Sequence, residues 1–279
     1  MNDPVKISVV VPVYGVERYM ERFAVSLFSQ DYPYVSYIFV NDGTRDRSMD
    51  ILKEVMERFP HVRDCVLIID KQNGGLPSAR RAGRAAVIGD YVWNVDPDDW
   101  IEDGALRNIA EFAAGNGMPD IIYFDFFKEY PDHSKIKIER DYAVDDKKHY
   151  IRNMFNHRSF GCVWNKCVRR DLYLDDHISF PEYSYAEDTY LTVQLVARAQ
   201  SICHLRRPLY HYSKNNPHSI TRQNTARRHR EYVLNFMDLY KRIRNSPDPD
   251  NPLAVISGPI LRRARWYNLI HNLGLKIRK

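Results

Sequence analysis

Three carboxylates stand within four positions, directly after an apolar stretch of the chain. Residues 91–95 have the β-branched and aromatic side chains of a strand, which places Asp96 at its carboxyl end and Asp98 and Asp99 in the following turn. Carboxylates crowded at the end of a buried strand repel one another and resist dehydration, so a divalent cation is their natural complement. An acidic turn that caps the helix expected over 102–115 would use the same residues. This stretch alone leaves both interpretations open.

The elements that must position these carboxylates alternate between strands and helices. Strands are expected over 7–13, 35–40, 65–69, 91–95 and 120–127, and helices over 17–29, 51–59, 78–87 and 102–115. This alternation predicts right-handed βαβ units and an α/β fold, a mostly parallel sheet with helices on both faces. In such a sheet the ligand lies beyond the carboxyl ends of the strands. Tyr14, Asp42, Asn73 and Asp96 all occupy such ends, so we expect them to share one crevice.

The alternation fades after residue 128. A hairpin or exposed loop is expected over 132–146, helices over 147–155, 187–199, 225–244 and 252–273, and short strands over 202–205 and 209–212. From Arg222 to Lys279 thirteen Lys or Arg face four Asp or Glu, a balance of +9, whereas the whole chain carries +5. The basic character therefore belongs to a smaller, mainly helical C-terminal region.

Composition excludes several classes of protein. The chain has 279 residues, of which 44% are hydrophobic and 28% are charged, as in a folded globular protein rather than a disordered one. No apolar run reaches the roughly 18–20 residues of a membrane span, and we expect a cytoplasmic protein. The cysteines follow no metal-binding spacing and are expected as reduced core residues: Cys65, Cys162, Cys167 and Cys203. We expect no nucleic-acid partner, because the sheet region is acidic and no binding motif appears.

Five motifs in order resemble the family 2 glycosyltransferases with the GT-A fold. They are Val9-Val10-Val11-Pro12-Val13-Tyr14, Val40-Asn41-Asp42-Gly43-Thr44, Asn73-Gly74-Gly75 with Ala79-Arg80, Asp96-Pro97-Asp98-Asp99, and Glu187-Asp188. The resemblance is dense over residues 5–115 and sparse to about 222. It implies a GT-A domain over 1–222, with a donor half over about 1–127 and an acceptor half over about 128–222. A basic helical extension then covers 223–279.

The resemblance implies a binding site for a nucleotide-sugar donor. Asp42 would accept a hydrogen bond from the imide N–H of uracil, and Tyr14 would border the base, with Pro12 and Glu17 near the nucleoside. A tight turn at Asp42 and a helix-favouring acid at Glu17 are the plainer alternatives. The remaining donor-binding candidates are Asn73, Gly74, Arg80, Asp96 and Asp98.

The same resemblance implies a metal and a base. Asp98 would touch Mn²⁺ or Mg²⁺, with Asp96 near the metal's water shell, and the cation would neutralise charge on the departing nucleoside diphosphate. Asp188 would take the proton of the acceptor hydroxyl during inversion at the anomeric carbon. An acidic pair that stabilises a helix N-terminus is the alternative for Glu187 and Asp188.

The acceptor candidates are Trp164, Lys166 and Glu187, although a buried Trp beside a surface Lys fits the first two as well. The acceptor itself would be a glycan or a polyprenyl-linked oligosaccharide. The end of the chain is expected to form a basic amphipathic helix in which three arginines combine with apolar side chains: Arg262, Arg263 and Arg265 with Trp266, Leu269, Ile270 and Leu273. Such a segment can lie on an anionic membrane surface, giving a peripheral membrane protein, but an ordinary packing helix has the same pattern.

The function implied is an inverting, metal-dependent transfer of a sugar from a nucleotide donor, UDP-linked by the resemblance, to a hydroxyl group. The transferred sugar, a hexose or an N-acetylhexosamine, is not specified by the motifs. A nucleotidyltransferase that makes sugar nucleotides is one alternative. Such an enzyme would require a Gly-rich loop with a basic residue after the first strand, and this chain has Pro12-Val13-Tyr14-Gly15 there. A non-catalytic glycan-binding protein is another, and it needs no base.

Overall fold

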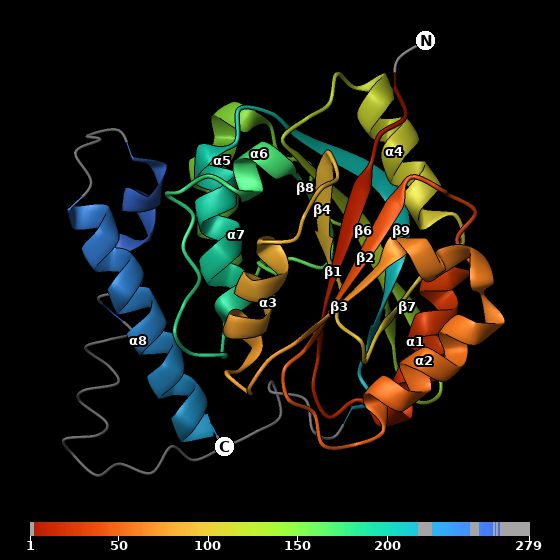
Figure 1. Cartoon of the computed structure of the whole chain (residues 1–279). Helices are drawn as coiled ribbons and strands as arrows, with labels where there is room; N and C mark the ends of the chain where they lie inside the picture. Colours follow the sequence, from red (N-terminus) through yellow and green to blue (C-terminus); the bar gives the residue numbers. More distant parts are fainter. Residues whose placement is uncertain (1–2, 217–224, 246–250, 259, 261, 263–279) are drawn as a thin grey trace.

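One nine-stranded sheet runs through the computed structural model, which describes residues 3–216, 225–245, 251–258, 260 and 262 (Figure 1). Neighbouring strands follow the order β3-β2-β1-β4-β8-β6-β9-β5, and β7 pairs with β6. The strands are β1 Ile7–Val13, β2 Val35–Asn41, β3 Val66–Asp70, β4 Tyr91–Asn94, β5 Trp100–Ile101, β6 Ile121–Glu129, β7 Ser134–Lys137, β8 Lys166–Arg169 and β9 Ile202–Ser213. The helices are α1 Glu17–Phe28, α2 Ser48–Arg58, α3 Leu76–Arg84, α4 Ala105–Gly115, α5 Lys147–Phe155, α6 Arg170–Tyr173, α7 Glu187–Arg198 and α8 Thr225–Arg244. The predicted α/β fold is confirmed.

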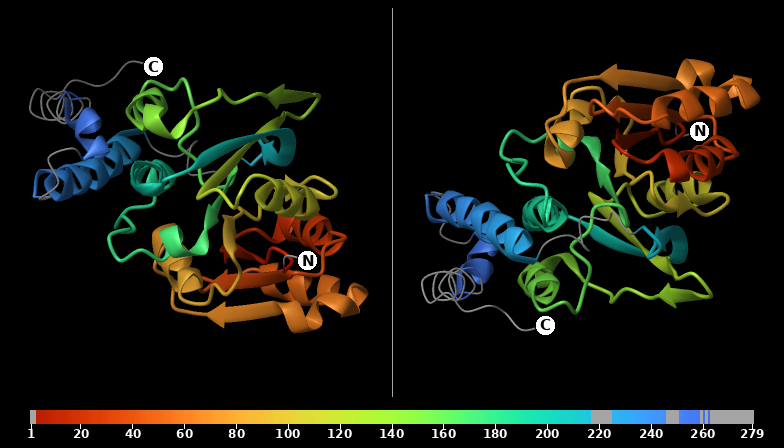
Figure 2. Two further views of the ribbon diagram at one scale, coloured as in Figure 1. Left: turned by 90° about the horizontal axis from the view of Figure 1, so that it is seen from above. Right: turned by 90° about the horizontal axis from the view of Figure 1, so that it is seen from below.

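The N-terminal half of the sheet is parallel and covered on both faces. Strands β3, β2, β1 and β4 pair in parallel, and every residue of β1 is buried. Val9 and Val11 belong to one core with α1, α2 and α4, whereas Val10 belongs to a second core with α3, α5 and α7. Figure 2 shows helices on both sides of the sheet. This double cover explains why these strands are continuous apolar runs in the sequence.

The second half of the sheet mixes parallel and antiparallel pairs. β8 runs antiparallel to both β4 and β6, β6 pairs with β9 in parallel, and β9 pairs with β5 antiparallel. The sequence predicts two short strands where β9 is one, because Arg206 and Arg207 interrupt the apolar pattern there. Both lie within the single strand, and a register shift beside Asp125 accommodates them. The expected hairpin is formed by β6 and β7.

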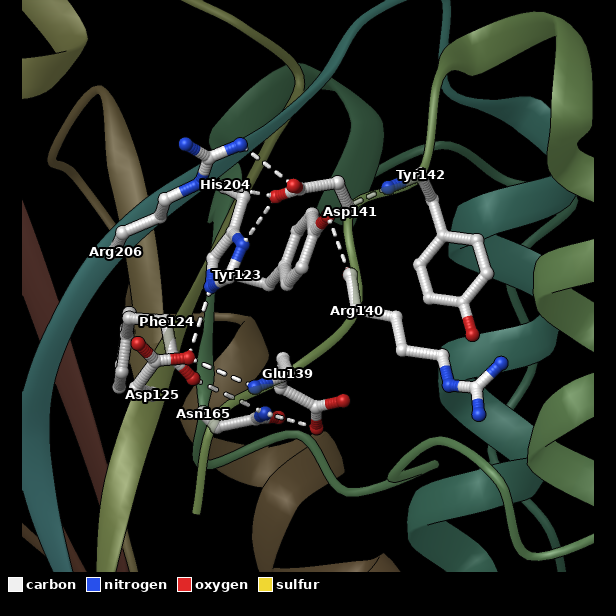
Figure 3. Close-up of polar contacts among 10 residues, drawn as sticks. All are labelled: Tyr123, Phe124, Asp125, Glu139, Arg140, Asp141, Tyr142, Asn165, His204 and Arg206. Carbon is white, nitrogen blue, oxygen red and sulfur yellow. Dashed lines mark hydrogen bonds and ion pairs between the residues drawn. The ribbon is translucent and has the colours of Figure 1, made fainter. Parts of the chain in front are cut away.

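The His204 ring bridges two carboxylates and fixes the segment that follows β7 (Figure 3). The His204 Nε2 lies 2.9 Å from Asp125 Oδ1, and its Nδ1 lies 2.7 Å from Asp141 Oδ1. The ring stacks on Tyr123, whose hydroxyl donates to the carbonyl of Arg140. These contacts hold residues 139–142 against β6 and β9.

Helix α8 packs along α7 on the side away from the sheet (Figures 1 and 2). Phe236 of α8 is fully buried, and the Tyr190 hydroxyl of α7 donates to Asp238 at 2.6 Å. Of the helix expected over 252–273, the structure describes a 3-10 turn, Pro252–Ile256, followed by helical conformation at residues 257, 258 and 260 and at the exposed Arg262. The rest of the segment proposed for membrane contact lies outside the described residues.

Asp46 joins the two loops that follow β1 and β2. Its Oδ1 accepts hydrogen bonds from the hydroxyls of Thr44 and Ser48 at 2.7 and 2.6 Å, and its Oδ2 accepts from the Glu17 N–H at 3.0 Å. Thr44 Oγ1 in turn accepts from the Gly15 N–H at 2.9 Å. Partial burial alone would raise the pKa of Asp46, but these hydrogen bonds outweigh it and lower the pKa. The ionised carboxylate therefore fixes the position of the loop next to Tyr14.

Replacing Asp46 by Asn should lower the free energy of unfolding at pH 7 by about 1–3 kcal/mol, because the amide nitrogen meets donors rather than acceptors. The folded-state pKa of Asp46 is depressed, so its contribution is present above the unfolded value of about 3.9 and is lost as the pH falls through the folded value. Urea unfolding from pH 7 to pH 3 should show the difference from wild type shrinking below about pH 4. Asp64→Asn, at an exposed position, is the control. A difference that stays constant down to pH 3 would contradict this role of the charge.

Candidate functional site

A cavity of about 910 Å³ opens beyond the carboxyl ends of β1, β2 and β4. The loops after these strands form one wall, and residues between α5 and α7 form the other. Its lining includes Pro12, Tyr14, Asp42, Asn73, Gly75, Asp96, Asp98, Asp99, His157, Ser159, Phe160, Cys162, Trp164, Ser184, Glu187, Asp188, Tyr212 and Asn216. The crevice expected from the strand order is therefore present, and residues distant in the sequence share it.

Asp42 is held in a fixed orientation at one end of this cavity. Its Oδ1 accepts from Lys71 Nζ at 2.5 Å and from the Gly74 N–H at 3.0 Å, and its Oδ2 accepts from the Gly75 N–H at 2.8 Å. Gly43 has a φ of +69°, and a Cβ there would lie 3.0 Å from the backbone nitrogen of Asn73. This close approach requires glycine, and it brings the β2 and β3 loops together. Tyr14 lines the same cavity with 57% of its surface exposed, available for stacking.

All three carboxylates of the acidic turn after β4 line the cavity, but Asp99 also has a structural role. Asp99 is buried and accepts hydrogen bonds from the Tyr210 hydroxyl and the Ser213 N–H, both at 2.7 Å. It therefore anchors β9 to the turn. Asp98 accepts from Asn216 Nδ2 at 2.8 Å, and burial raises its pKa.

Asp96 belongs to a buried cluster around Arg80. The guanidinium lies 2.8 Å from Asp96 and forms ion pairs with Glu187 and Asp188. Burial raises the pKa of Asp96 to about 7, although the charge of Arg80 opposes the shift. Burial, and then the charge of Asp188, raise the pKa of Glu187 well above its usual range. Both shifts favour the protonated forms of Asp96 and Glu187. In this cluster three acidic groups share one guanidinium.

The backbone at the entrance to α7 is itself strained. Ala186, immediately before Glu187, has a φ of +62° and a ψ of +23°, a left-handed conformation that costs a residue with a Cβ of order 1 kcal/mol. Its carbonyl accepts the Tyr190 N–H at 3.0 Å, which starts the helix. The strain brings Glu187 and Asp188 to the cavity at the N-terminus of α7.

The predicted site residues divide into two groups. Those that line the cavity are Pro12, Tyr14, Asp42, Asn73, Asp96, Asp98, Trp164, Glu187 and Asp188. Those absent from its lining are Glu17, Gly74, Arg80 and Lys166. Arg80 is 1% exposed and lies behind the carboxylates, and Glu17 accepts the Arg47 N–H at 3.1 Å. Gly74 uses its N–H on Asp42.

Lys166 and Trp164 stabilise the cavity wall formed by the residues between α5 and α7. Lys166 is 2% exposed, and its Nζ donates to the carbonyls of Phe160 and Cys162 and to Asn165 Oδ1 at 2.7–3.0 Å. Trp164 is 4% exposed and stacks on Tyr210 with ring centroids 4.6 Å apart. Only a small part of the indole therefore faces the cavity.

Sequence reasoning missed part of this wall. Tyr212 stacks on Trp164 at 5.1 Å, Phe160 packs edge-on against Phe126 at 4.9 Å, and Asn216 holds Asp98. The alternation of Tyr210 and Tyr212 in a predicted strand was a usable signal, because it places both rings on one face. Residues 157–161 offered no such pattern.

Among the described residues, no three His, Cys, Asp or Glu side chains form a group that could hold a metal by themselves. Mg²⁺ and similar cations need only one or two protein carboxylates when substrate phosphates complete the shell. Asp96 and Asp98 meet that requirement. No Lys or Arg of the described part of the chain lines the cavity, whereas six carboxylates do. These residues fit a divalent cation bound together with a phosphate-bearing ligand.

The described portion also lacks any helix with the length and apolarity needed to traverse a bilayer.

Comparison with solved structures supports the fold. The S. aureus TarS 1–349 structure in complex with UDP-GlcNAc matches with a TM-score of 0.75 at 20% identity, over 98% of this chain and 76% of that one. The mannosyltransferase PcManGT from Pyrobaculum calidifontis, in complex with GDP-Man and Mn²⁺, matches with a TM-score of 0.61 at 18% identity, over 96% of this chain and 71% of that one. Both are similar in architecture to the sheet and helices described above.

Sequence comparison identifies the family. EpsH of Bacillus subtilis, a putative glycosyltransferase, is 30% identical over 212 residues, which cover 74% of this chain and 60% of EpsH, so the chain spans well under the full length of this relative. The model of glycosyl transferase family 2 matches residues 8–175, which include β1, β2 and β4 and the loops that follow them. With the GT-A-like fold and the shared cavity, these matches lead to one conclusion: the chain belongs to glycosyl transferase family 2.

Proposed function

We propose that this glycosyltransferase is an inverting, cation-dependent enzyme that moves a sugar from a UDP-sugar to a hydroxyl of a glycan or polyprenyl-linked acceptor. The observation that carries the proposal is the single cavity in which Asp42, Asp98 and Asp188 meet. Two structural neighbours are complexes with UDP-GlcNAc and with GDP-Man and Mn²⁺, and these nucleotide-sugars are of the kind this cavity would take. Its volume of about 910 Å³ lies within the usual range for ligand pockets.

The charge of the cavity supports a cation requirement. A nucleoside diphosphate is an anion, and the described residues offer it carboxylates but no Lys or Arg in the cavity lining. Two anionic partners in a partly desolvated site repel each other unless a cation lies between them. Asp98 and Asp96 would hold Mn²⁺ or Mg²⁺ there. When bound, the cation would supply electrostatic stabilisation of the negative charge on the leaving diphosphate.

The residues of this chain would divide the remaining work. Tyr14 would border the base, and the carboxylate of Asp42 would accept its imide N–H. The acceptor hydroxyl oxygen would attack the anomeric carbon while the bond from that carbon to the diphosphate oxygen breaks. Asp188 would take the hydroxyl proton, and the electron pair would leave with the diphosphate. Arg80 fixes the Asp188 carboxylate, so the base would be oriented before the acceptor arrives.

A nucleotidyltransferase is less compatible with this geometry. It must bind the phosphates of a triphosphate, and the loop after β1 offers Tyr14, Gly15 and Val16 to the cavity rather than a basic side chain. A non-catalytic binding protein would not need the strained backbone at Ala186, which places Glu187 and Asp188 at the cavity. Release of UDP from a UDP-sugar, rather than of pyrophosphate from UTP, distinguishes the enzymes.

Replacing Asp188 by Asn should lower kcat at least about 100-fold, because a positioned general base contributes that much or more. The affinity for UDP should remain within about twofold of wild type. UDP release under saturating donor and isothermal titration with UDP measure the two quantities. Glu182→Gln, an exposed acid in the loop before α7, is the matched control and should leave both unchanged. Undiminished turnover in the Asp188 variant would remove this residue from the role of base.

Replacing Asp98 by Asn should abolish the part of UDP affinity that depends on Mn²⁺, because the neutral amide is a poor ligand for a hard cation. Titration with UDP in Mn²⁺ and in EDTA measures that part directly. Wild type should bind more tightly with Mn²⁺, and the variant should bind equally weakly in both. Asp103→Asn removes an exposed acid five positions further along and should behave as wild type. An intact Mn²⁺ effect in the Asp98 variant would place the cation elsewhere.

A further inference from the structure

Three lysines share one face of the β6–β7 ribbon. Lys128 lies directly opposite Lys135 in the antiparallel register, and Lys137 lies opposite Phe126 two positions away on the same face. Residues directly opposite on antiparallel strands have side chains about 4.5–5.5 Å apart at Cβ, so like charges there oppose the pairing of the strands. We call Lys128, Lys135 and Lys137 the lysine ribbon.

Within the described residues no carboxylate forms an ion pair with the lysine ribbon, although the charge of the nearby Glu139 partly opposes the lowered pKa of Lys128. None of the three ammonium groups forms an ion pair or a side-chain hydrogen bond in that part of the chain; each instead lies over an aromatic ring. A neighbouring acid, Glu139, is 5% exposed and turns its carboxylate toward Asn165 Nδ2 at 3.0 Å (Figure 3). Burial, and then the charge of Lys137, lower the pKa of Lys128. The arrangement therefore costs folding free energy.

Phe160 connects the lysine ribbon to the cavity. The Lys128 Nζ lies 4.8 Å and the Lys137 Nζ 5.7 Å from the centroid of the Phe160 ring, and that ring lines the cavity wall opposite the donor loops. Tyr212 lies on the same wall, and Lys214 Nζ is 4.2 Å from the centroid of its ring. Aromatic faces suit sugar rings, and ammonium groups suit anions. The wall thus presents aromatic rings to the cavity, and ammonium groups that are not part of the cavity lining pack against those rings.

We propose that the lysine ribbon binds the phosphate groups of a polyanionic glycan acceptor, whose sugar portion extends past Phe160 to Asp188. This inference rests on the proposed function and specifies its acceptor. The charges agree: an acidic cavity with no Lys or Arg in its described lining takes the hydroxyl end, while the lysines outside it take the negative charges of the acceptor chain. Lysine serves such a role as a compact point charge. An unfavourable cluster of like charges is a typical cost of a binding site, and the ligand relieves it.

The direct test measures binding of a poly(glycerol phosphate) oligomer and of neutral dextran of similar length by fluorescence anisotropy. Wild type should prefer the phosphate oligomer, and the variant Lys128→Gln/Lys135→Gln/Lys137→Gln should lose about tenfold or more of that affinity, as expected for three partly exposed ion pairs. The control Lys6→Gln/Lys53→Gln/Lys241→Gln removes the same net charge from exposed sites and should bind as wild type. Equal binding of dextran and the phosphate oligomer, or equal losses in the two triple variants, would overturn the proposal.

Two further measurements distinguish this proposal from the alternatives that the lysines bind the donor or a lipid surface. UDP affinity in Mn²⁺ should be the same in wild type and in the lysine-ribbon variant; a parallel loss would assign the lysines to the donor and overturn the proposal. Absent UDP binding in both, with phosphate-oligomer binding retained, would count against the proposed function alone. Vesicles of phosphatidylglycerol at equal phosphate concentration should bind less than the oligomer, and the reverse order would assign the lysines to a lipid surface instead.

The charge reversal Lys135→Glu distinguishes a loss of binding from a loss of folding stability. Lys135→Glu places an opposite charge across from Lys128, so it should raise the unfolding midpoint in urea while it lowers affinity for the phosphate oligomer. A lower midpoint together with unchanged affinity would show that the lysines serve the fold rather than the acceptor.

Discussion

The guanidinium of Arg80 is buried against three carboxylates from two distant parts of the chain: Asp96 in the turn after β4, and Glu187 and Asp188 in the first turn of α7. Removing water from these four charges is costly, and their attraction offsets that cost only while the geometry holds. Loss of one partner from such a cluster costs roughly 3–5 kcal/mol, because the others then remain buried without compensation. The cluster therefore fixes Asp96, in the acidic turn, and Asp188, at the start of α7, relative to each other. Every role proposed for the cavity depends on that separation.

Arg80 does not neutralise the site completely. The raised pKa values of Asp96 and Glu187 show that burial outweighs the attraction of the single guanidinium. A site left with excess negative charge is poorly stable by itself and favours a cationic ligand. The lysine ribbon shows the opposite imbalance on the neighbouring surface. The excess negative charge of the cavity and the excess positive charge of the lysine ribbon lie on opposite sides of Phe160. Together they would orient an acceptor whose own charge is negative.

The N-terminal half was predictable because local patterns and global topology agree there. Double-covered strands such as Ile7–Val13 are continuous apolar runs, and a parallel sheet brings their carboxyl ends together. The cavity wall formed by the loops after these strands follows from that rule alone.

The other wall was not predictable in the same way. The short β8 has no periodicity long enough to recognise, and β9 crosses the Arg206-Arg207 break by a register shift. The family resemblance implied that Arg80 and Lys166 face ligands, yet both are buried against oxygen atoms from residues that lie elsewhere in the sequence or in the adjoining loop. Single-sequence patterns do not encode which partners tertiary packing will supply.

Acidic side chains at the rim of the cavity would hold a cation that in turn holds the diphosphate of the donor. Crystals grown with UDP and Mn²⁺ test this central claim most directly, through anomalous difference density collected near the manganese absorption edge. We expect one strong peak between the Asp98 carboxylate and the diphosphate, with uracil between Tyr14 and Asp42. UDP bound in this cavity without an anomalous peak, or bound with its diphosphate away from Asp98, would contradict the claim.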